Sequence, residues 1–388
     1  MPSRRTLLQM SLGAMLMPAA AGPAAAWRSQ ARAGTPHDQD RPARQSILRL
    51  DSNENSLGMS PEARKVFARS LDVANRYPDG HAQALCDALA ADLTVSPDQI
   101  LLTNGSTASI RAIVQSFRQN RPSTAEGRVV AQDPTFGIVE RLCRDLGLAY
   151  HGVPTGKDFA PDMVAMEKAA RKDGGPVLVY MVTPNNPTGV VAPTPALFDW
   201  IRRADEETIF LIDEAYHDYV DAPSYESAVR LIRDGHRNVI VTRTFSKLHG
   251  MAGLRVGYAV AHKDTMADLS RFSDGWNINS TGLMVAKASL ADTSWRAHCL
   301  RQNTEARTIL TDTLDTLGLG HIPGHTNFVL HRIAADHADY KRRMADHGVL
   351  VGRYMRTGPG WNRLSLGTPD EMRRFVDILT DFRRRGWA

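Results

Sequence analysis

The chain has 388 residues, more than one ordinary domain needs, so we expect a large unit with a smaller one. Hydrophobic residues make up 43% and charged residues 23%, a composition typical of globular proteins. The formal net charge is +5, but the 47 basic and 42 acidic residues are interspersed along most of the chain, which argues against a nucleic-acid-binding protein.

The first 26 residues have the pattern of an export signal. Arg4 and Arg5 precede an apolar run at residues 10–17, and a small-residue cleavage site follows at residues 24–26. This arrangement is typical of signal peptides of the twin-arginine type, so we expect an exported, periplasmic protein. The apolar run is too short to span a bilayer, and we expect no stable membrane association after processing.

After an N-terminal arm at residues 27–60, short apolar runs alternate with helical patterns. The runs that predict buried strands are 100–102, 129–131, 177–182, 209–212 and 239–241, and helical patterns lie at 108–117 and 137–146. Buried strands separated by helices indicate an α/β fold with a mainly parallel central sheet flanked by helices. We assign these elements to a large domain at residues 61–290.

The C-terminal part predicts a smaller α+β domain at residues 291–388. A largely helical pattern at 279–300 leads into this domain. The pattern is then strand-like at 326–331 and 363–366 and helical again at 369–384. The three cysteines, Cys86, Cys143 and Cys299, are an odd number without clustered spacing. They therefore favour buried free thiols over a disulfide framework, and we expect no metal site.

A lysine with a candidate chemical role follows the apolar run 239–241, in the stretch Thr244-Phe245-Ser246-Lys247. A lysine at the exit of a buried parallel strand lies where α/β sheets bind ligands, and its amine can condense with an aldehyde. Most lysines are solvated surface charges, so this position alone decides little. A glycine-containing turn follows, however, and Arg255 lies eight residues on, where a guanidinium can bind a phosphate bidentately.

An aspartate follows the apolar run 209–212 in the same way. In isolation Asp213 would most simply cap a helix. Next to the aldehyde cofactor pyridoxal phosphate (PLP), an aspartate has a specific task, because it keeps the ring nitrogen protonated. Tyr216, three residues later, is placed to reach the phenolic oxygen of the same ring.

Two polar loops follow other predicted strands. Asn186 lies in the loop 183–189, which is rich in Asn, Pro and Gly; such a loop is ordinarily a turn, but its amide can also donate to the phenolic oxygen of PLP. Residues 104–107 precede the helical pattern 108–117. Free backbone N–H groups and hydroxyls at a helix N-terminus bind phosphate, although an ordinary Ser or Thr cap is equally common.

Taken together, these motifs resemble those of the fold-type I aminotransferases, which use PLP. The motifs that stand in the order and spacing of that family are Asn186-Pro187-Thr188-Gly189, Asp213-Glu214-Ala215-Tyr216, Ser246-Lys247 and Arg255. From residue 48 to the C-terminus the chain is most similar to the histidinol-phosphate aminotransferase family. The motifs for that choice are Asn53-Glu54-Asn55, Arg76-Tyr77-Pro78-Asp79, Asp133-Pro134-Thr135-Phe136, Asn277-Ile278-Asn279-Ser280 and Arg363-Leu364-Ser365-Leu366-Gly367-Thr368.

The resemblance implies a homodimer that moves the α-amino group of an amino acid to a 2-oxo acid, with PLP bound to Lys247 as a Schiff base. It implies that Asp213 holds the ring nitrogen, that Asn186 and Tyr216 bind the phenolic oxygen, and that Phe136 stacks on the ring. The further cofactor-binding residues that it implies are Gly105, Ser106, Thr107, Thr244, Ser246 and Arg255, with Tyr77 supplied by the neighbouring subunit. The substrate-binding residues that it implies are Arg363, which would clamp the α-carboxylate, Asn55 and Arg353.

One motif departs from the family pattern. Family members carry Asn-Glu-Asn-Pro-Tyr-Gly, whereas residues 53–58 here are Asn-Glu-Asn-Ser-Leu-Gly, so Leu57 replaces the tyrosine associated with the phosphate end of the substrate. Arg353 and Arg356 lie in the region that faces the distal end of the substrate in this family; they favour an acidic distal group unless they are solvated surface arginines. Another PLP reaction (decarboxylase, lyase or oxidase) and a catalytically silent binding protein are the alternatives.

Overall fold

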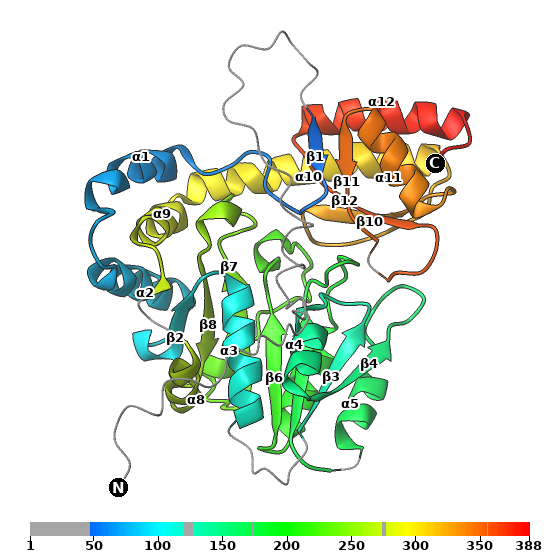
Figure 1. Ribbon diagram of the computed structural model, residues 1–388. Coiled ribbons are helices and arrows are strands. Elements are labelled where there is room, and N and C mark those ends of the chain that lie inside the picture. The colour runs from blue at the N-terminus through cyan, green and yellow to red at the C-terminus, as the bar shows by residue number, and fades with distance from the viewer. Residues whose placement is uncertain (1–46, 120–126, 173, 274–276, 355) are drawn as a thin grey trace, which may run out of the picture. The chain divides into compact units, whose positions relative to one another are not determined.

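The five strands predicted for the large domain join two that were not predicted, β4 and β8, in one seven-stranded sheet. The computed structural model describes residues 47–119, 127–172, 174–273, 277–354 and 356–388 (Figure 1). The strand order is β2-β8-β7-β6-β5-β3-β4. The bounds are β2 Ile100–Thr103, β3 Arg128–Asp133, β4 Ala149–Pro154, β5 Val177–Val182, β6 Thr208–Asp213, β7 Val239–Thr244 and β8 Gly257–Ala261. The predicted signal peptide, and the part of the predicted arm up to residue 46, lie outside the described residues.

The direction of the strands decides where a site can form. β8 is antiparallel to both of its neighbours, β2 and β7, while β7, β6, β5, β3 and β4 pair in parallel. Six strands therefore run the same way and end at the same edge of the sheet. The predicted α/β fold with a mainly parallel sheet is confirmed, and the reversed β8 is a feature that the sequence pattern did not predict.

Helices cover both faces of this sheet. One face packs against α2 Asp79–Leu93, α5 Met163–Arg171, α6 Thr194–Arg203, α7 Val229–Arg233 and α9 Ser280–Ala291. The other face packs against α3 Ser106–Gln119, α4 Ile138–Leu146 and α8 Lys263–Leu269. β5 is buried at every residue, as its uninterrupted apolar sequence predicts for a central strand. Burying each such side chain stabilises the fold by about 1.5–3 kcal/mol.

The C-terminal part forms two smaller sheets. Its elements are α10 Thr293–Thr316, β9 His321–Ile322, β10 Phe328–Arg332, α11 His337–Asp346, β11 Val349–Val351, β12 Trp361–Ser365 and α12 Pro369–Arg384. β12, β10 and β9 form an antiparallel sheet, and β11 pairs in parallel with β1 Leu48–Leu50 from the predicted N-terminal arm. These strands and helices share one hydrophobic core. Residues 47–388 form a single compact unit, so the predicted domain boundary near residue 290 stays a prediction.

Local signals explain the ends of the C-terminal helices. The predicted helix 369–384 is α12 to the residue, because Thr368 and Glu371 form a reciprocal capping box in front of Pro369. The helical pattern predicted at 279–300 is divided between α9 and α10, since the Asp292 side chain caps α10 by accepting from Trp295 N. α1 Pro61–Arg69 packs against α9.

Neither a membrane-spanning helix nor a metal-binding cluster is found in the part of the chain that the structure describes. Its helices lack a segment that is both long and apolar enough to cross a bilayer. Its His, Cys, Asp and Glu side chains form no group of three or more that could hold a metal ion. Cys86, Cys143 and Cys299 are free thiols.

Candidate active site

The predicted site residues lie where strands of the large sheet end. Asp213 is the last residue of β6, and Lys247 follows β7 by three residues. Asn186 follows β5, and Gly105 follows β2. Because these four strands run in the same direction, their carboxyl ends bring the four residues to one edge of the sheet, the edge at which open α/β sheets bind ligands.

Lys247 lies among side chains that converge on Tyr216. Its Nζ donates to the backbone oxygen of Asn53 at 3.1 Å and lies 5.5 Å from the centre of the Tyr216 ring. The Tyr216 hydroxyl in turn accepts from the side-chain amides of Asn53 at 3.0 Å and Asn186 at 3.4 Å. The structure thus brings the predicted residues Lys247, Tyr216 and Asn186 into one contact group and adds Asn53 to it.

Asp213 is a buried carboxyl beside this group. Its Oδ1 accepts from the backbone N–H of Ala215 at 3.2 Å and from the Thr242 hydroxyl at 3.3 Å. Burial is the largest effect on its pKa, which rises from 3.8 to about 6, although these two hydrogen bonds and the cation of Lys247 oppose the rise. Ionised Asp213 therefore lacks a fully compensating partner within the protein, and a cation placed next to it would gain a strong interaction.

An anion-binding arrangement surrounds Arg255. Its Nη1 donates to the Ser246 hydroxyl at 3.1 Å, and that hydroxyl also accepts from Thr244 at 2.9 Å. Its Nη2 donates to the backbone oxygen of Asn104, the residue before Gly105. Gly105 has φ +78°, and a Cβ there would lie 2.1 Å from Arg255 Nη2, so only glycine allows this close approach.

The N-terminus of α3 completes this arrangement. Ser106 and Thr107 are its first residues, so their backbone N–H groups lie in the helical turn that has no intrahelical acceptors. Gly257, which begins β8, packs directly against it, since a Cβ at Gly257 would lie 2.4 Å from the Ser106 nitrogen. The guanidinium of Arg255, the hydroxyls and the helix N-terminus together fit a phosphate.

Arg363 adjoins the contact group at Asn186 and is 8% exposed. Its Nη1 donates to Asn186 Oδ1 at 2.8 Å and its Nη2 to the backbone oxygen of Asp51 at 2.9 Å, while its Nε is buried without a hydrogen-bond partner. Burial lowers the pKa of the guanidinium, and Arg353 nearby adds to this effect. A carboxylate bound here would supply both the missing acceptor and the missing negative charge.

Comparison with known proteins decides the family. The family model described as aminotransferase class I and II matches residues 45–379. The chain belongs to the class I and II aminotransferase family. A histidinol-phosphate aminotransferase from Moorella thermoacetica is 33% identical over 340 residues, which cover 86% of this chain and 85% of that protein. The expectation of a transferase enzyme is thereby confirmed.

Solved structures of the family agree with the fold. A candidate histidinol-phosphate aminotransferase from Erwinia carotovora atroseptica matches with a TM-score of 0.85 and 37% identity over 88% of this chain and 97% of its own. A histidinol-phosphate aminotransferase from Sinorhizobium meliloti, solved in complex with pyridoxal-5'-phosphate, matches with a TM-score of 0.79 and 25% identity over 88% of this chain and 92% of its own. The predicted fold-type I architecture is confirmed.

The residues of this aminotransferase fit PLP at each end of the cofactor. Asp213, with its raised pKa, suits a protonated ring nitrogen. Tyr216 and Asn186 suit the phenolic oxygen, and the group around Arg255 suits the phosphate. The amine of Lys247 lies beside Tyr216, where an aldehyde carbon next to the phenolic oxygen would meet it.

Asn53 is a functional candidate to which the sequence assigned no role of its own beyond its place in the motif Asn53-Glu54-Asn55. It has φ 54°, and its amide and backbone oxygen contact Tyr216 and Lys247. Asn55 was predicted to bind substrate, but the structure does not bring it into the contact group. Its Nδ2 donates to the backbone oxygen of Leu248 at 2.7 Å and its Oδ1 accepts from Leu57 N at 3.1 Å, so both ends of the amide are bound to the backbone of the protein.

Phe136 and Tyr77 were both predicted to contact the cofactor. Phe136 is half-buried in the loop after β3, and this loop is held by a hydrogen bond from the Thr135 hydroxyl to Asn185 Oδ1 at 2.8 Å, next to Asn186. Tyr77 lies on the segment before α2 and is 77% exposed. The predicted ring-stacking role of Phe136 and the phosphate-binding role of Tyr77 stay predictions.

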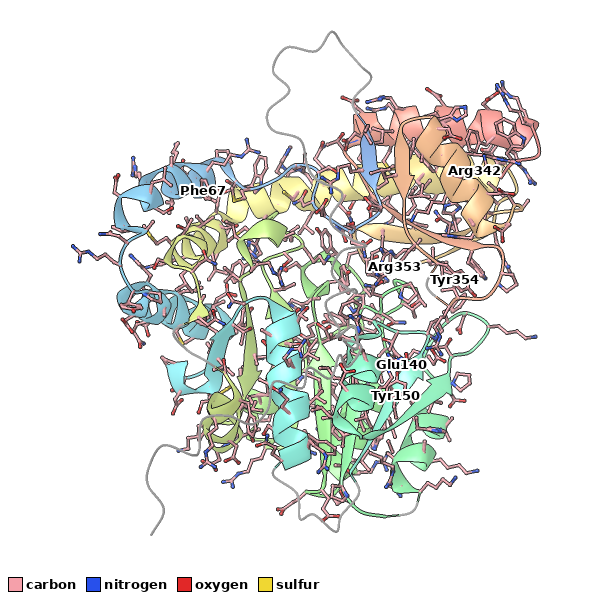
Figure 2. The ribbon with its side chains drawn as sticks, viewed as in Figure 1. Phe67, Glu140, Tyr150, Arg342, Arg353 and Tyr354 are labelled. Carbon is pink, nitrogen blue, oxygen red and sulfur yellow. The ribbon has the colours of Figure 1, made fainter. Side chains whose placement is uncertain are left out.

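The two arginines after β11 differ in their surroundings. Arg356 is paired with two carboxylates, since its Nη1 donates to Glu140 Oε2 at 2.8 Å and its Nη2 to Asp133 Oδ2 at 3.3 Å. Arg353 is exposed and acts electrostatically on Arg363. Figure 2 shows Arg353 between the C-terminal strands and α4, which carries Glu140. Of these two residues, Arg353 is therefore the better candidate for a substrate contact.

Proposed function

We propose that this aminotransferase uses PLP attached to Lys247 to transfer the α-amino group of an amino acid with an anionic distal group to a 2-oxo acid. The observation that carries the proposal is the contact group itself. Lys247, Tyr216, Asn186 and Arg363 form a chain of contacts in which one end offers an amine and the other a buried guanidinium nitrogen without a partner. The transferase activity follows from the family.

Different residues of the chain have different roles in the proposed reaction. When bound, PLP supplies an electron sink that stabilises negative charge on the α-carbon of the amino acid. Asp213 keeps a proton on the ring nitrogen, which maintains that sink. Arg363 binds the α-carboxylate and so orients the α-carbon. Once the amino group of the substrate has replaced it on the cofactor, Lys247 Nζ is free to act as the base that takes the α-proton. The amides of Asn186 and Asn53 hold the Tyr216 hydroxyl in place.

The distal part of the substrate is proposed from charge. Arg353 and Arg363 are close enough for one guanidinium to influence the pKa of the other, and a substrate with two anionic groups would neutralise both. The relatives named histidinol-phosphate aminotransferases support a phosphate as one such group. Leu57 stands where the family has a tyrosine for that phosphate, so a distal carboxylate is the other option.

We also propose a homodimer and an exported protein. Tyr77, exposed on the segment before α2, would bind the phosphate of PLP in the neighbouring subunit, as the resemblance implies. The motif with Arg4 and Arg5 would direct export by the twin-arginine route, which carries folded proteins and so suits a protein that binds its cofactor before it leaves. Size measurement of the processed protein and fractionation of expressing cells test these two proposals.

A half-reaction screen tests the proposed function. Amino acids are added one at a time to the PLP-loaded protein, and the absorption of the cofactor is followed. Conversion to the pyridoxamine form by an amino acid alone supports transamination, and we expect amino acids with an anionic distal group to react fastest. Release of carbon dioxide, ammonia or peroxide without a 2-oxo acid would instead indicate another PLP reaction.

Borohydride reduction tests the attachment point. Peptide mapping of the reduced protein should find the cofactor on Lys247, and a Lys247→Ala variant should carry none. Lys65→Ala is the matched control, because Lys65 is an exposed lysine paired with Glu62 on α1. A Lys247→Ala variant that retained all biological activity would favour a catalytically silent binding protein.

A further inference from the structure

Two side chains lie directly behind the candidate site, on the opposite face of the large sheet. Side chains alternate between the faces of a strand. Leu211 packs on the face covered by α3, α4 and α8, so Asp213, two residues later, continues on this front face, as does its register partner Thr242. Glu214 and Arg243, one residue further along β6 and β7, therefore point to the back face.

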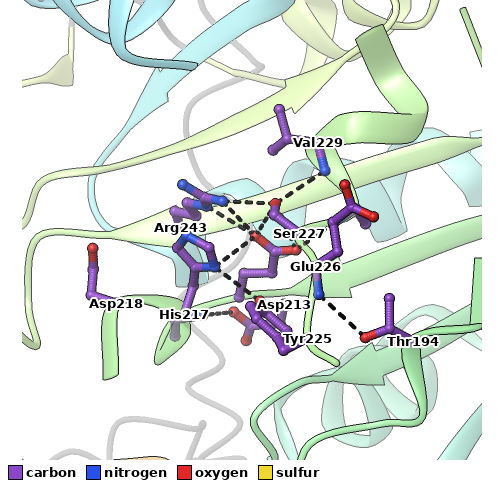
Figure 3. A network of polar contacts seen from close by, with 12 residues as sticks. Thr194, Asp213, His217, Asp218, Tyr225, Glu226, Ser227, Val229 and Arg243 are labelled. Carbon is purple, nitrogen blue, oxygen red and sulfur yellow. Dashed lines mark hydrogen bonds and ion pairs between the residues drawn. The ribbon is translucent and has the colours of Figure 1, made fainter. Parts of the chain in front are cut away.

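Glu214 is 2% exposed, and its carboxylate joins two segments of the chain. Arg243 donates to Oε2 through Nε at 3.0 Å and Nη2 at 2.8 Å. From the loop before α7, the Ser227 hydroxyl donates to Oε2 at 2.8 Å and the Ala228 N–H to Oε1 at 2.8 Å. Figure 3 shows Arg243 next to Ser227, to whose hydroxyl its Nη2 also donates at 2.8 Å. Both oxygens are thus held by protein donors.

His217, three residues after Glu214, contacts the same loop as Glu214. Tyr216 belongs to the contact group of Lys247, whereas the neighbouring His217 lies 2.9 Å (Nδ1) from the Tyr225 hydroxyl and 3.9 Å from Glu214 Oε2 (Figure 3). Burial lowers the pKa of His217, although Glu214 and Asp218 oppose this effect. Asp213 and Tyr216 face the cofactor side. The residue after each of them, Glu214 or His217, contacts the segment 225–228.

Glu214 and Arg243 are both ionised. Burial alone would raise the pKa of Glu214, but Arg243 and the hydrogen bonds hold it below its usual value. Burial alone would lower the pKa of Arg243, but Glu214 raises it. Tyr258, Tyr225 and Asp218 also raise the pKa of Arg243, His217 lies close enough for Arg243 to lower its pKa, and Asp218 is paired with Arg296.

We propose that the buried Glu214–Arg243 pair is a positioning device that fixes the ends of β6 and β7 to each other, so that Asp213 and Lys247 keep the spacing that PLP needs. The geometry that carries this is the contact of Glu214, next to Asp213, with Arg243, four residues before Lys247. The proposal rests on the proposed function, because Asp213 and Lys247 are its cofactor contacts. Glu214 and Arg243 act through the backbone and are not catalytic residues.

Two variants and one control test the proposal. Glu214→Gln removes the charge while its amide oxygen can still accept from Ser227, and Arg243→Lys keeps the charge but loses the two-nitrogen contact. Both should weaken PLP binding to the cofactor-free protein by about 10- to 100-fold, the range seen when outer residues that orient a ligand group are removed. Glu226→Gln is the matched control in the same loop, because it breaks an exposed pair with Arg230, and it should bind PLP like the wild type.

The decisive readouts separate positioning from a merely structural role. For both variants we expect the pH midpoint of the visible absorption band of bound PLP to shift, with kcat lowered and KM for the amino acid, which Arg363 sets, little changed. Variants that are only less stable, with unchanged PLP affinity and an unchanged midpoint, would overturn the proposal. If Glu214→Gln does not fold, Arg243→Lys decides by the same readouts. A wild-type protein that fails to bind PLP at Lys247 would refute the proposed function instead.

Discussion

Replacing Asp213 with asparagine is expected to raise the free energy of unfolding of the protein without PLP and to lower that of the protein with PLP. In the folded protein the pKa of Asp213 is raised by burial from 3.8 to about 6. The folded state therefore binds a proton that the unfolded chain has lost between these two pH values, and stability falls as pH rises through this window. The rise corresponds to about 3 kcal/mol at 1.36 kcal/mol for each pH unit, and above pH 6 this cost is complete.

Asparagine removes the cost because it cannot ionise, and its Oδ1 can still accept from Ala215 N and the Thr242 hydroxyl. We expect Asp213→Asn to raise the free energy of unfolding of the cofactor-free protein by up to about 3 kcal/mol at pH 8 and by almost nothing at pH 4. With PLP bound the sign reverses, because the ionised aspartate then faces the protonated ring nitrogen. Activity should fall steeply.

Urea unfolding at several pH values, with and without PLP at one protein concentration, measures both effects. Asp218→Asn is the matched control. Burial would raise the pKa of Asp218 too, but His249, His217 and the two arginines nearby lower it, and Arg296 lies 3.4 Å from its carboxylate, so its removal should cost stability at pH 8. The reasoning fails if the cofactor-free Asp213→Asn protein is no more stable than the wild type at pH 8, or if its advantage persists at pH 4.

Three further substitutions test single contacts of the site. Arg363→Lys keeps the charge but loses the planar fork, so KM for the amino acid should rise by about 10- to 100-fold while PLP affinity, measured by titration, stays unchanged. Gly105→Ala places a Cβ 2.1 Å from Arg255 Nη2 at φ +78°, and PLP affinity should fall at least tenfold, about 1.4 kcal/mol, whereas an unchanged affinity would contradict the phosphate site. Asn53→Ala should lower kcat more than Asn55→Ala does, since of these two residues only Asn53 contacts Tyr216 and Lys247. Equal effects would show that Asn53 does not belong to the contact group.

The parts of the site that lie directly after a strand could be predicted from the sequence. β5, β6 and β7 each contain a continuous apolar run, and each run is followed within a few residues by a polar group such as Asp213 or Lys247. The carboxyl ends of parallel strands meet at one edge, so a local pattern was sufficient to bring these residues together. The family resemblance then gave each of them a role that the structure allows.

Contacts between distant segments could not be predicted in this way. Asn53 reaches the site because its backbone N–H donates to the Ser365 hydroxyl, 312 residues later, and no local pattern records that contact. β1 has only three residues, and its pairing with β11 was missed for the same reason. β8 was also missed, because its short sequence is a weak apolar run, and an apolar run would not have revealed its reversed direction. The Glu214–Arg243 pair depends on the register of β6 and β7.

The hydrogen bonds between Asn53 and Ser365 also determine at which point of its synthesis the protein can form the complete site. The segment that carries Asn53 can contact its partner strand only after the ribosome has synthesised the chain through Ser365. A nascent or truncated chain that stops short of Arg363 contains every lysine, aspartate and glycine motif of the cofactor site. It nevertheless lacks both the substrate clamp and the residues that hold Asn53 beside the lysine. Cofactor capture in a productive geometry therefore requires a chain that reaches at least Ser365, and a shorter fragment with intact motifs should be inactive.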